Sequence, residues 1–263
     1  MRSAFGDHVE VAMDGYVAVV TFNRPPHNFV SVGFMHDLFD AMDSVGAENK
    51  ARAIVLQSEG KTFSAGADFS PSTHAWTSGT GADELRAFYH QAVRLFSVKL
   101  PIVAAVQGAA VGAGLGLALV SDFRVAAPEA RFVANFIKLN FHPGFGLTHT
   151  LPRLIGQQRA SLMFLTGRRI KAEEGLAWGL VDEVVPAHEL RPAALRLAAE
   201  IAANGPLAVA ATRNTLRGKL GAEVRTQLDD IEYPEQIRLR ETEDFQEGVR
   251  SVAERRPGNF VGR

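Results

Sequence analysis

The sequence predicts an α/β fold with a helical C-terminal part, and three observations support this prediction. Up to about residue 186, segments with strand-like apolar patterns alternate with segments of helical periodicity. From about residue 187 the strand-like segments stop, and amphipathic helical segments follow. The 263 residues are 46% hydrophobic, which suffices for one large buried core.

The N-terminal segments begin the alternation. Residues 9–25 have the pattern of two strands around a turn at Asp14 and the following glycine, because apolar residues alternate on both sides of it. Residues 31–48 carry apolar side chains at helical spacing, with Ser31 as a candidate N-cap. Residues 51–60 are a predicted buried strand.

The middle of the chain continues the pattern. Residues 70–82 are rich in Ser, Thr and Gly, which predicts a mobile loop whose His74 could close over a ligand. Residues 84–100 form an amphipathic helix. Tyr89 and His90 are neighbours on this helix, so we expect one to face the core and the other to face solvent.

The apolar stretch 101–120 permits two interpretations. It contains no charge, and its glycines include three at four-residue spacing, which is typical of a membrane helix. Against a membrane span stand Pro101, the β-branched run in 102–106, and a glycine density that weakens a continuous helix. We therefore predict a buried strand over 102–106, a glycine turn, and a helix over about 112–121.

Composition excludes several classes of function. A formal net charge of -1 gives no broad attraction to nucleic acid or to an anionic membrane surface. The chain has no cysteine, which removes disulfides, thiolate catalysis and cysteine-ligated zinc. The eight histidines show no metal-binding spacing, so no metal site is expected. The N-terminus lacks the apolar region of a signal peptide, and a cytoplasmic location is expected.

Glycine-rich turns are the candidate chemical sites. The windows that begin at Gly112 and Gly144 lack the last glycine of the dinucleotide fingerprint, and no Gly-Lys-Ser or Gly-Lys-Thr sequence exists. Two small-residue turns remain, at 63–68 and 108–114, each after a predicted buried strand. If they lie side by side, they aim two backbone N–H donors at one oxygen, which is an oxyanion hole.

Four blocks of the sequence resemble the enoyl-CoA hydratase/isomerase, or crotonase, superfamily. They are GKTFSAGAD, KLPIVAAVQGAAVGAGLGLALVSDFRVAAPEARF, GRRIKAEEGLAWGLVDEVVP and EDFQEGVRSVAERRPGNF, in the family's order. The resemblance runs from about residue 8 to residue 260. It implies a spiral of ββα units with two roughly perpendicular sheets, a core over residues 1–200, and a C-terminal helical region over 201–263 that builds a homotrimer or a dimer of trimers.

The same resemblance implies an acyl-CoA thioester as the ligand, with coenzyme A as part of the substrate and no tightly bound cofactor. It implies that the backbone N–H groups of Ala67 and Ala113 form the family's oxyanion hole. It also implies a set of binding candidates around these two residues, namely Ala65, Gly66, Gly112, Asp68 and Arg24. A turn or cap position is the alternative for Asp68, and a solvated loop position is the alternative for Arg24.

The sequence departs from the family at its acid/base positions. The family's hydratases use two glutamates to add water, and alignment of the blocks places Gly116 and Phe136 where those glutamates belong. Gly144 does not supply the aspartate that some relatives carry in this turn. Ordinary two-glutamate hydration is therefore not expected. Phe136 and Phe141 predict an apolar acyl pocket, although core packing also explains them.

Two other polar side chains are candidates for handling protons or water. His142 lies in the loop that, by resemblance, borders the acyl carbon, and histidine titrates near neutrality; a capping or packing role is the alternative. Asn140 could orient a water or a substrate oxygen, or it could be a turn residue.

Two classes of function stay open. One is an acyl-CoA enzyme with a non-glutamate acid/base that isomerises, decarboxylates, hydrolyses or hydrates by another route. The other is a non-catalytic acyl-CoA-binding protein.

Overall fold

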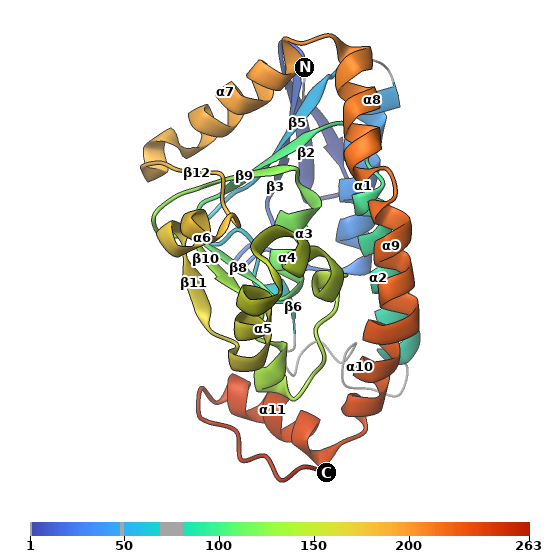
Figure 1. Cartoon of the computed structure of the whole chain (residues 1–263), viewed down its shortest axis with the longest axis vertical. Helices are drawn as coiled ribbons and strands as arrows, with labels where there is room; N and C mark the ends of the chain where they lie inside the picture. The colour runs from blue at the N-terminus through green and yellow to red at the C-terminus, as the bar shows by residue number, and fades with distance from the viewer. Residues whose placement is uncertain (1, 48–49, 69–80) are drawn as a thin grey trace.

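A seven-stranded sheet is the largest element of the computed structural model, which describes residues 2–47, 50–68 and 81–263 (Figure 1). Its strands in spatial order are β1 (Arg2–Phe5), β2 (Val9–Asp14), β3 (Val17–Phe22), β5 (Ala53–Ser58), β7 (Ile102–Val106), β9 (Phe123–Ala126) and β12 (Glu183–Val184). The first three pair antiparallel, and all pairings from β3 to β12 are parallel. The predicted strand pair around Asp14 is confirmed.

Two smaller sheets complete the strand framework. One joins β8 (Ala109–Val111), β10 (Arg131–Val133) and β11 (Arg169–Lys171), and the other pairs β4 (Phe29–Val30) with β6 (Gly66–Ala67). The sequence analysis missed β8, because three residues between Gly108 and Gly112 are too few to show a period of two. Its parallel pairing with β10 creates the strand.

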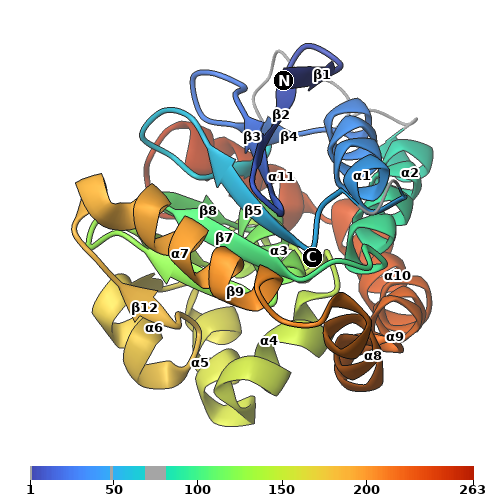
Figure 2. The same ribbon diagram turned by 90° about the horizontal axis from the view of Figure 1, so that it is seen from above.

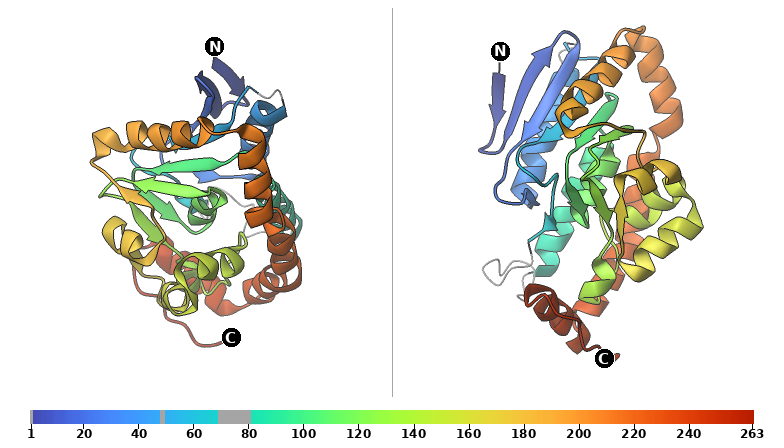
Figure 3. Two further views of the ribbon diagram at one scale, coloured as in Figure 1. Left: turned by 45° about the horizontal axis from the view of Figure 1, so that its top comes forward. Right: turned by 90° about the vertical axis from the view of Figure 1, so that its left-hand side faces the viewer.

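Helices cover both faces of the large sheet (Figures 2 and 3). On one face α1 (Val32–Ala47) packs against β2 and β3, with α2 (Gly81–Phe96) beside it. On the other face α7 (Leu190–Ala202) packs against β5, β7 and β9. Within β5, Ile54 belongs to the core on the first side, and Val55 belongs to the core under α7. Burial on both faces explains the uninterrupted apolar run of this strand.

The predicted loop over 70–82 lies mostly outside the described residues, and His74 lies outside them entirely. The last two residues of that range belong to α2, which ends at Phe96 rather than next to Pro101. The expectation for the two neighbours on this helix is confirmed, since Tyr89 is buried and His90 is exposed.

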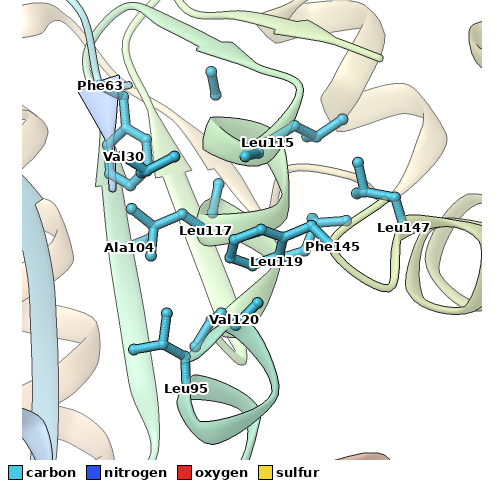
Figure 4. Packing of buried hydrophobic residues seen from close by; sticks show 14 of the residues in the cluster. Val30, Phe63, Leu95, Ala104, Leu115, Leu117, Leu119, Val120, Phe145 and Leu147 are labelled. Carbon is cyan, nitrogen blue, oxygen red and sulfur yellow. The ribbon is translucent and has the colours of Figure 1, made fainter. Parts of the chain in front are cut away.

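The apolar stretch 101–120 is not one helix. It forms β7, β8 and then α3 (Ala113–Val120), all eight residues of which are buried. Figure 4 shows Leu115, Leu117 and Leu119 of α3 packed among other core side chains. Among the described residues, no helix is both long enough and apolar enough to cross a membrane. Tertiary burial therefore accounts for the hydropathy of this stretch.

The remaining helices follow in two groups. Between β10 and α7 lie a 3₁₀-helix (Phe136–Leu139), α4 (Leu147–Ile155), α5 (Gln157–Thr166), α6 (Ala172–Trp178) and a second 3₁₀-helix (Ala187–Glu189). After α7 come α8 (Pro206–Arg217), α9 (Leu220–Gln227), a π-helix (Leu228–Glu232), α10 (Tyr233–Arg240) and α11 (Glu243–Ala253).

The C-terminal helices run back along the core rather than away from it (Figure 1). α9 packs against α2 and α4, and α11 packs against the 3₁₀-helix over Phe136–Leu139. The expected boundary between residues 200 and 201 falls inside α7, which ends at Ala202. Oligomerisation through residues 201–263 stays a prediction.

Asp122 ties α8 to the large sheet. Its carboxylate accepts hydrogen bonds from the Nε of Arg213 (3.0 Å), from Nη1 of Arg217 (2.8 Å) and from the backbone N–H of Ile102 (2.8 Å). The Asp122 side chain is only 10% exposed. The Asp122 carboxylate therefore connects the first residue of β7 to two successive turns of α8.

Replacing Asp122 with Asn is expected to lower the free energy of unfolding by about 3 kcal/mol, because two partly buried guanidinium groups lose their charge partner. Replacing Glu235 with Gln removes an exposed ion pair with Arg238 and is expected to have little effect. Urea unfolding of the two variants measures the difference. Equal stabilities would show that the Asp122 cluster does not hold α8.

Candidate functional site

A cavity of about 530 Å³ lies where the two small-residue turns approach α2 and the end of α11. Seven of the predicted site residues line it: Ala65, Ala67, Asp68, Gly112, Ala113, Phe136 and Phe141. A larger hollow of about 1250 Å³ next to α8 contains none of the predicted site residues. Its carboxylates Asp122 and Glu223 are already paired with arginines. The smaller cavity is therefore the candidate site.

The two turns meet through backbone contacts. The N–H of Ser64 donates to the carbonyl of Ala109 (3.0 Å), and the N–H of Val111 donates to the carbonyl of Ser64 (3.0 Å). Gly66 has φ +83°, and a Cβ on it would lie 2.4 Å from the carbonyl oxygen of Val111 and 3.3 Å from the nitrogen of Ala113. Only glycine fits this contact. The turns that the sequence analysis expected to lie side by side do so.

Ala113 is the first residue of α3, after Gly112 with φ +54°. The first N–H groups of a helix have no acceptor inside the helix, and they carry partial positive charge. Ala113 borders the cavity with 7% of its surface exposed. Ala67 in β6 also lines the cavity, one residue after the contact at Gly66. The structure thus brings together the two residues whose amide groups were predicted to act jointly.

An aromatic ring fills the space beside Gly116, which the family resemblance aligns with the first glutamate. A Cβ on Gly116 would lie 2.3 Å from Cδ1 of Phe145, which is fully buried. Figure 4 shows Phe145 lying against α3. Phe145 has φ +63°, a conformation that bulky residues rarely adopt. Gly116 therefore does not line the cavity as expected, and no side chain fits at that position while Phe145 stays in place.

Phe136, which the family resemblance aligns with the second glutamate, lines the cavity. One edge of its ring lies 3.7 Å from where a Cβ of Gly112 would be. Phe141 lines the cavity as well and packs on Phe245 of α11, with ring centroids 5.0 Å apart. Both predicted acyl-pocket aromatics are therefore on the cavity wall, which is predominantly apolar.

Three predicted polar residues lie outside the cavity lining. The Nδ1 of His142 is 2.7 Å from the carbonyl oxygen of Pro143, and Asn140, with φ +49°, donates from Nδ2 to Oγ1 of Thr242 (3.1 Å). The guanidinium of Arg24 donates to the carbonyl of Phe29. The expected proton transfer by His142 and ligand contacts by Asn140 and Arg24 thus gain no support from their placement. Each of the three side chains is instead engaged in a hydrogen bond within the protein.

The C-terminal segment holds the loop that carries Phe145. Buried Gln236 accepts from the hydroxyl of Tyr89 (2.5 Å) and donates to the carbonyl of His142 (2.6 Å). Fully buried Glu232 accepts from the backbone N–H groups of Gly146 (2.8 Å) and Thr148 (2.9 Å). It thereby caps the start of α4. The loop is therefore fixed at both ends by residues about ninety positions further along the chain.

Burial shifts the pKa values of this network. Desolvation raises the pKa of Glu232 to about 7, although hydrogen bonds from Thr148 and Gly146 oppose the shift. Burial, followed by the nearby Glu232 carboxylate, raises the pKa of the Tyr89 hydroxyl well above its usual value. Tyr89 therefore stays protonated at neutral pH.

Sequence reasoning missed several residues of the cavity lining, and three of them come from segments that it did not connect with the site. Asn135 lines it next to Phe136, and Val252 and Arg255 line it from the end of α11. In the sequence, the ending EDFQEGVRSVAERRPGNF indicates only the family resemblance and a C-terminal oligomerisation region. No local pattern indicates that it folds back over its own cavity, because that depends on the packing of α9 and α10.

Residues 13–263 match the sequence model of the enoyl-CoA hydratase/isomerase family. The chain is 36% identical over 256 residues to a probable enoyl-CoA hydratase of Rhodobacter capsulatus, covering 94% of this chain and 95% of that protein. It is 31% identical over 253 residues to a crotonyl-CoA hydratase of Syntrophomonas wolfei, covering 94% and 95%.

Solved structures agree with these similarities. An enoyl-CoA hydratase/isomerase from Pseudoalteromonas atlantica superposes with a TM-score of 0.85 at 28% identity, over 97% of this chain and 100% of that one. An enoyl-CoA hydratase from Mycobacterium avium subsp. paratuberculosis superposes with a TM-score of 0.83 at 29% identity, over 97% and 98%. The predicted crotonase-type fold is confirmed.

Gly116→Ala is expected to lower the free energy of unfolding by about 1–3 kcal/mol, because its methyl group overlaps the Phe145 ring. In a double-mutant cycle with Phe145→Ala, the two changes should be coupled by at least about 1 kcal/mol. Gly33→Ala in α1 is the matched control, because a Cβ there meets nothing within 4 Å. Additive effects in the cycle would contradict the steric account.

Glu232→Gln is expected to change how stability depends on pH. Because the pKa of Glu232 is raised in the folded state, the wild type loses stability as pH rises from about 4.5 to about 7, and loses no more above 7. The loss is on the order of 3 kcal/mol. The variant lacks this term, so its stability should fall less than that of the wild type between pH 5 and pH 8.

Urea unfolding of both proteins at pH 5 and pH 8 measures this difference. The Tyr89 hydroxyl is neutral at both values and adds no slope of its own. Parallel pH profiles for the two proteins would show that Glu232 does not titrate in this range.

Proposed function

The chain belongs to the enoyl-CoA hydratase/isomerase family, and on this premise we propose that its cavity binds an acyl-CoA thioester through an oxyanion hole made by the amide groups of Ala67 and Ala113. The observation that carries the proposal is the contact at Gly66, whose absent side chain lets the 64–67 backbone reach the start of α3. Both alanines line the same cavity.

Such a hole favours chemistry that passes through an enolate. When a proton or a carboxyl group leaves the α-carbon of a thioester, negative charge collects on the carbonyl oxygen. Backbone N–H donors stabilise that oxygen without titrating themselves, and loss of one such donor typically costs roughly 3 kcal/mol of transition-state stabilisation. The donor at Ala113 gains further strength from its place at the start of a helix.

Coenzyme A enters this proposal as part of the substrate, and no resident cofactor is proposed. The family resemblance assigns the coenzyme to the 63–68 turn, and Ala65 and Asp68 of this turn line the cavity. Arg255 lines the cavity from the end of α11 and is exposed, so its positive charge suits a ligand that carries phosphates.

The reaction is proposed to differ from two-glutamate hydration. Among the described lining residues, Asp68 is the only carboxylate. The family resemblance aligns Gly116 and Phe136 with the two glutamates. Double-bond isomerisation, decarboxylation, thioester hydrolysis or hydration with other groups all need the hole and fit this cavity. The apolar wall that includes Phe136 and Phe141 suits a hydrocarbon or aromatic acyl group.

A non-catalytic acyl-CoA-binding protein is the second candidate. It is favoured by the buried ring of Phe145 against Gly116, which closes the space where the family's first acid/base would stand. For either candidate we propose assembly as a homotrimer or a dimer of trimers, which would bury exposed apolar residues of α8 such as Leu207 and Leu216.

Incubating the protein with a panel of CoA thioesters in heavy water tests the proposal. The panel holds saturated, 2-enoyl, 3-enoyl, malonyl-type and aromatic acyl groups, and mass spectrometry follows each compound. Deuterium at the α-carbon is expected for at least one thioester, because the hole stabilises the enolate. Binding without any deuterium uptake or mass change would favour the non-catalytic candidate, and absence of binding would contradict both.

Ala113→Pro removes one donor while keeping a residue that suits the first position of a helix. It is expected to lower the exchange or turnover rate by at least about 100-fold. Gln157→Pro, at the first position of α5, is the matched control, because Gln157 is exposed and outside the cavity lining. Equal loss in both variants would assign the effect to proline rather than to the missing donor.

A further inference from the structure

The Glu232 carboxylate is fully buried and has no charged partner among the described residues. Glu232 ends the π-helix, and its two oxygens accept hydrogen bonds from the backbone N–H groups of Gly146 (2.8 Å) and Thr148 (2.9 Å) and from the Thr148 hydroxyl (2.5 Å). All three donors are neutral. A buried carboxyl group without a cation nearby favours its protonated form, because burial penalises the charge.

Ionisable groups on the surrounding helices do not compensate this burial. The Tyr89 hydroxyl of α2 interacts with Glu232, and burial keeps this hydroxyl neutral. Ionisable side chains on the other elements are engaged elsewhere or exposed: His149 and Arg153 of α4 contact Glu223 of α9, Arg238 of α10 contacts Glu235, Arg240 interacts with Tyr233 and Glu84, and Asp229 and Asp230 of the π-helix are exposed.

Glu232 holds a segment, residues 142–148, whose backbone is strained. Phe145 has φ +63°, which a bulky residue rarely adopts, and its ring is fully buried against Gly116 and Phe88. Such a conformation persists only where the surrounding structure enforces it. The hydrogen bonds from Gly146 and Thr148 to Glu232 lie directly after Phe145, and they supply part of this constraint.

Two side chains of the C-terminal segment hold residues 142–148, and they differ in chemistry. Gln236 donates to the carbonyl of His142, and its carboxamide does not titrate. Glu232 holds the other end through a group that does titrate, and burial raises the pKa of this carboxyl to about 7. In an open form, where water reaches the carboxyl, this pKa returns to about 4.5. The observed closed form is therefore stabilised by a proton, and it loses this stabilisation as pH rises from about 4.5 to about 7.

We propose that Glu232 is a pH-dependent switch for the segment 142–148: the protonated carboxyl keeps the segment closed, and ionisation favours its release together with Phe145. Gln236 keeps the start of the segment attached at His142, so the opening is local. The switch goes beyond the proposed function, because it does not depend on which ligand the cavity binds.

Release of the segment would change the candidate site from behind its wall. Phe88 lines the cavity, and the Phe145 ring packs on the Phe88 ring with centroids 6.1 Å apart. When Phe145 leaves, the space beside Gly116 becomes empty. Gly116 lies about one helical turn after Ala113, which lines the cavity.

Hydrogen exchange of the native protein tests the switch. Mass spectrometry follows peptides that cover residues 142–150 at pH 5 and pH 8, and each rate is divided by the intrinsic rate of an unstructured peptide at the same pH. The resulting protection is expected to fall on the order of 50-fold from pH 5 to pH 8. Low concentrations of urea should leave this exchange unchanged, because a local opening exposes little surface, whereas exchange in β5 should accelerate with urea.

Two variants distinguish the carboxyl from the rest of the segment. Glu232→Gln cannot ionise, so protection over 142–150 should be equal at pH 5 and pH 8. Thr148→Val removes a hydroxyl that lowers the pKa of Glu232, so the fall in protection should continue to higher pH than in the wild type. A purely structural role of Thr148 would instead lower protection equally at every pH. Glu223→Gln is the matched control, because this more exposed carboxylate also contacts α4, through His149, and its loss should keep the wild-type pH dependence.

Three outcomes would overturn the proposal. The protection of the wild-type segment is the same at pH 5 and pH 8; or Glu232→Gln retains the wild-type fall; or exchange over 142–150 responds to urea as steeply as exchange in β5, which would assign it to global unfolding. If Glu232→Gln does not fold, the Thr148→Val profile decides, and an unshifted profile contradicts the switch.

Discussion

The candidate site depends on one close contact between two backbones. Residues 64–67 lie against residues 109–113 so tightly that a Cβ on Gly66 or Gly114 would come within 2.4 Å of a carbonyl oxygen on the opposite segment. This contact sets the start of α3 beside β6 and so places Ala67 and Ala113 on one cavity. Hydrogen bonds through Ser64 hold the register of the two segments. Side chains at the glycine positions would separate the two amide donors that the proposed chemistry needs.

The C-terminal helices complete the cavity of their own chain. Glu232 caps α4, and Gln236 bonds to Tyr89 and to the loop at His142, so the wall of the cavity is held by a segment far away in sequence. The end of α11 then adds Arg255 to the lining. Truncation of this region would therefore change the site itself, in addition to any role in assembly. Buried polar groups can hold such a loop only because each of them is hydrogen-bonded.

The ring of Phe145 and the backbone of Gly116 form a second close contact. Gly116 has no side chain, and the ring of Phe145 fills the space beside it. Phe145 adopts an unfavourable φ in doing so. We propose that the oxyanion hole is kept, while Gly116 and Phe136 stand at the positions where the family resemblance places the two glutamates of ordinary hydration.

The sequence by itself determined the strand pair β2–β3, the strands β5 and β7, the helices α1, α2 and α3, and the two small-residue turns. These are encoded in local periodicity and in motif residues at fixed spacing. It failed at β8, which is three residues long and exists through its pairing with β10. It also placed Gly116, His142, Asn140 and Arg24 at the site, whereas the structure leaves them off the cavity wall and puts Asn135 and Arg255 on it. Only the tertiary structure decided these points. Phe145 fills the space beside Gly116, which lies 29 positions earlier, and Asn140 bonds to Thr242, which lies more than 100 positions later. Contacts between residues so far apart leave no local pattern in the sequence.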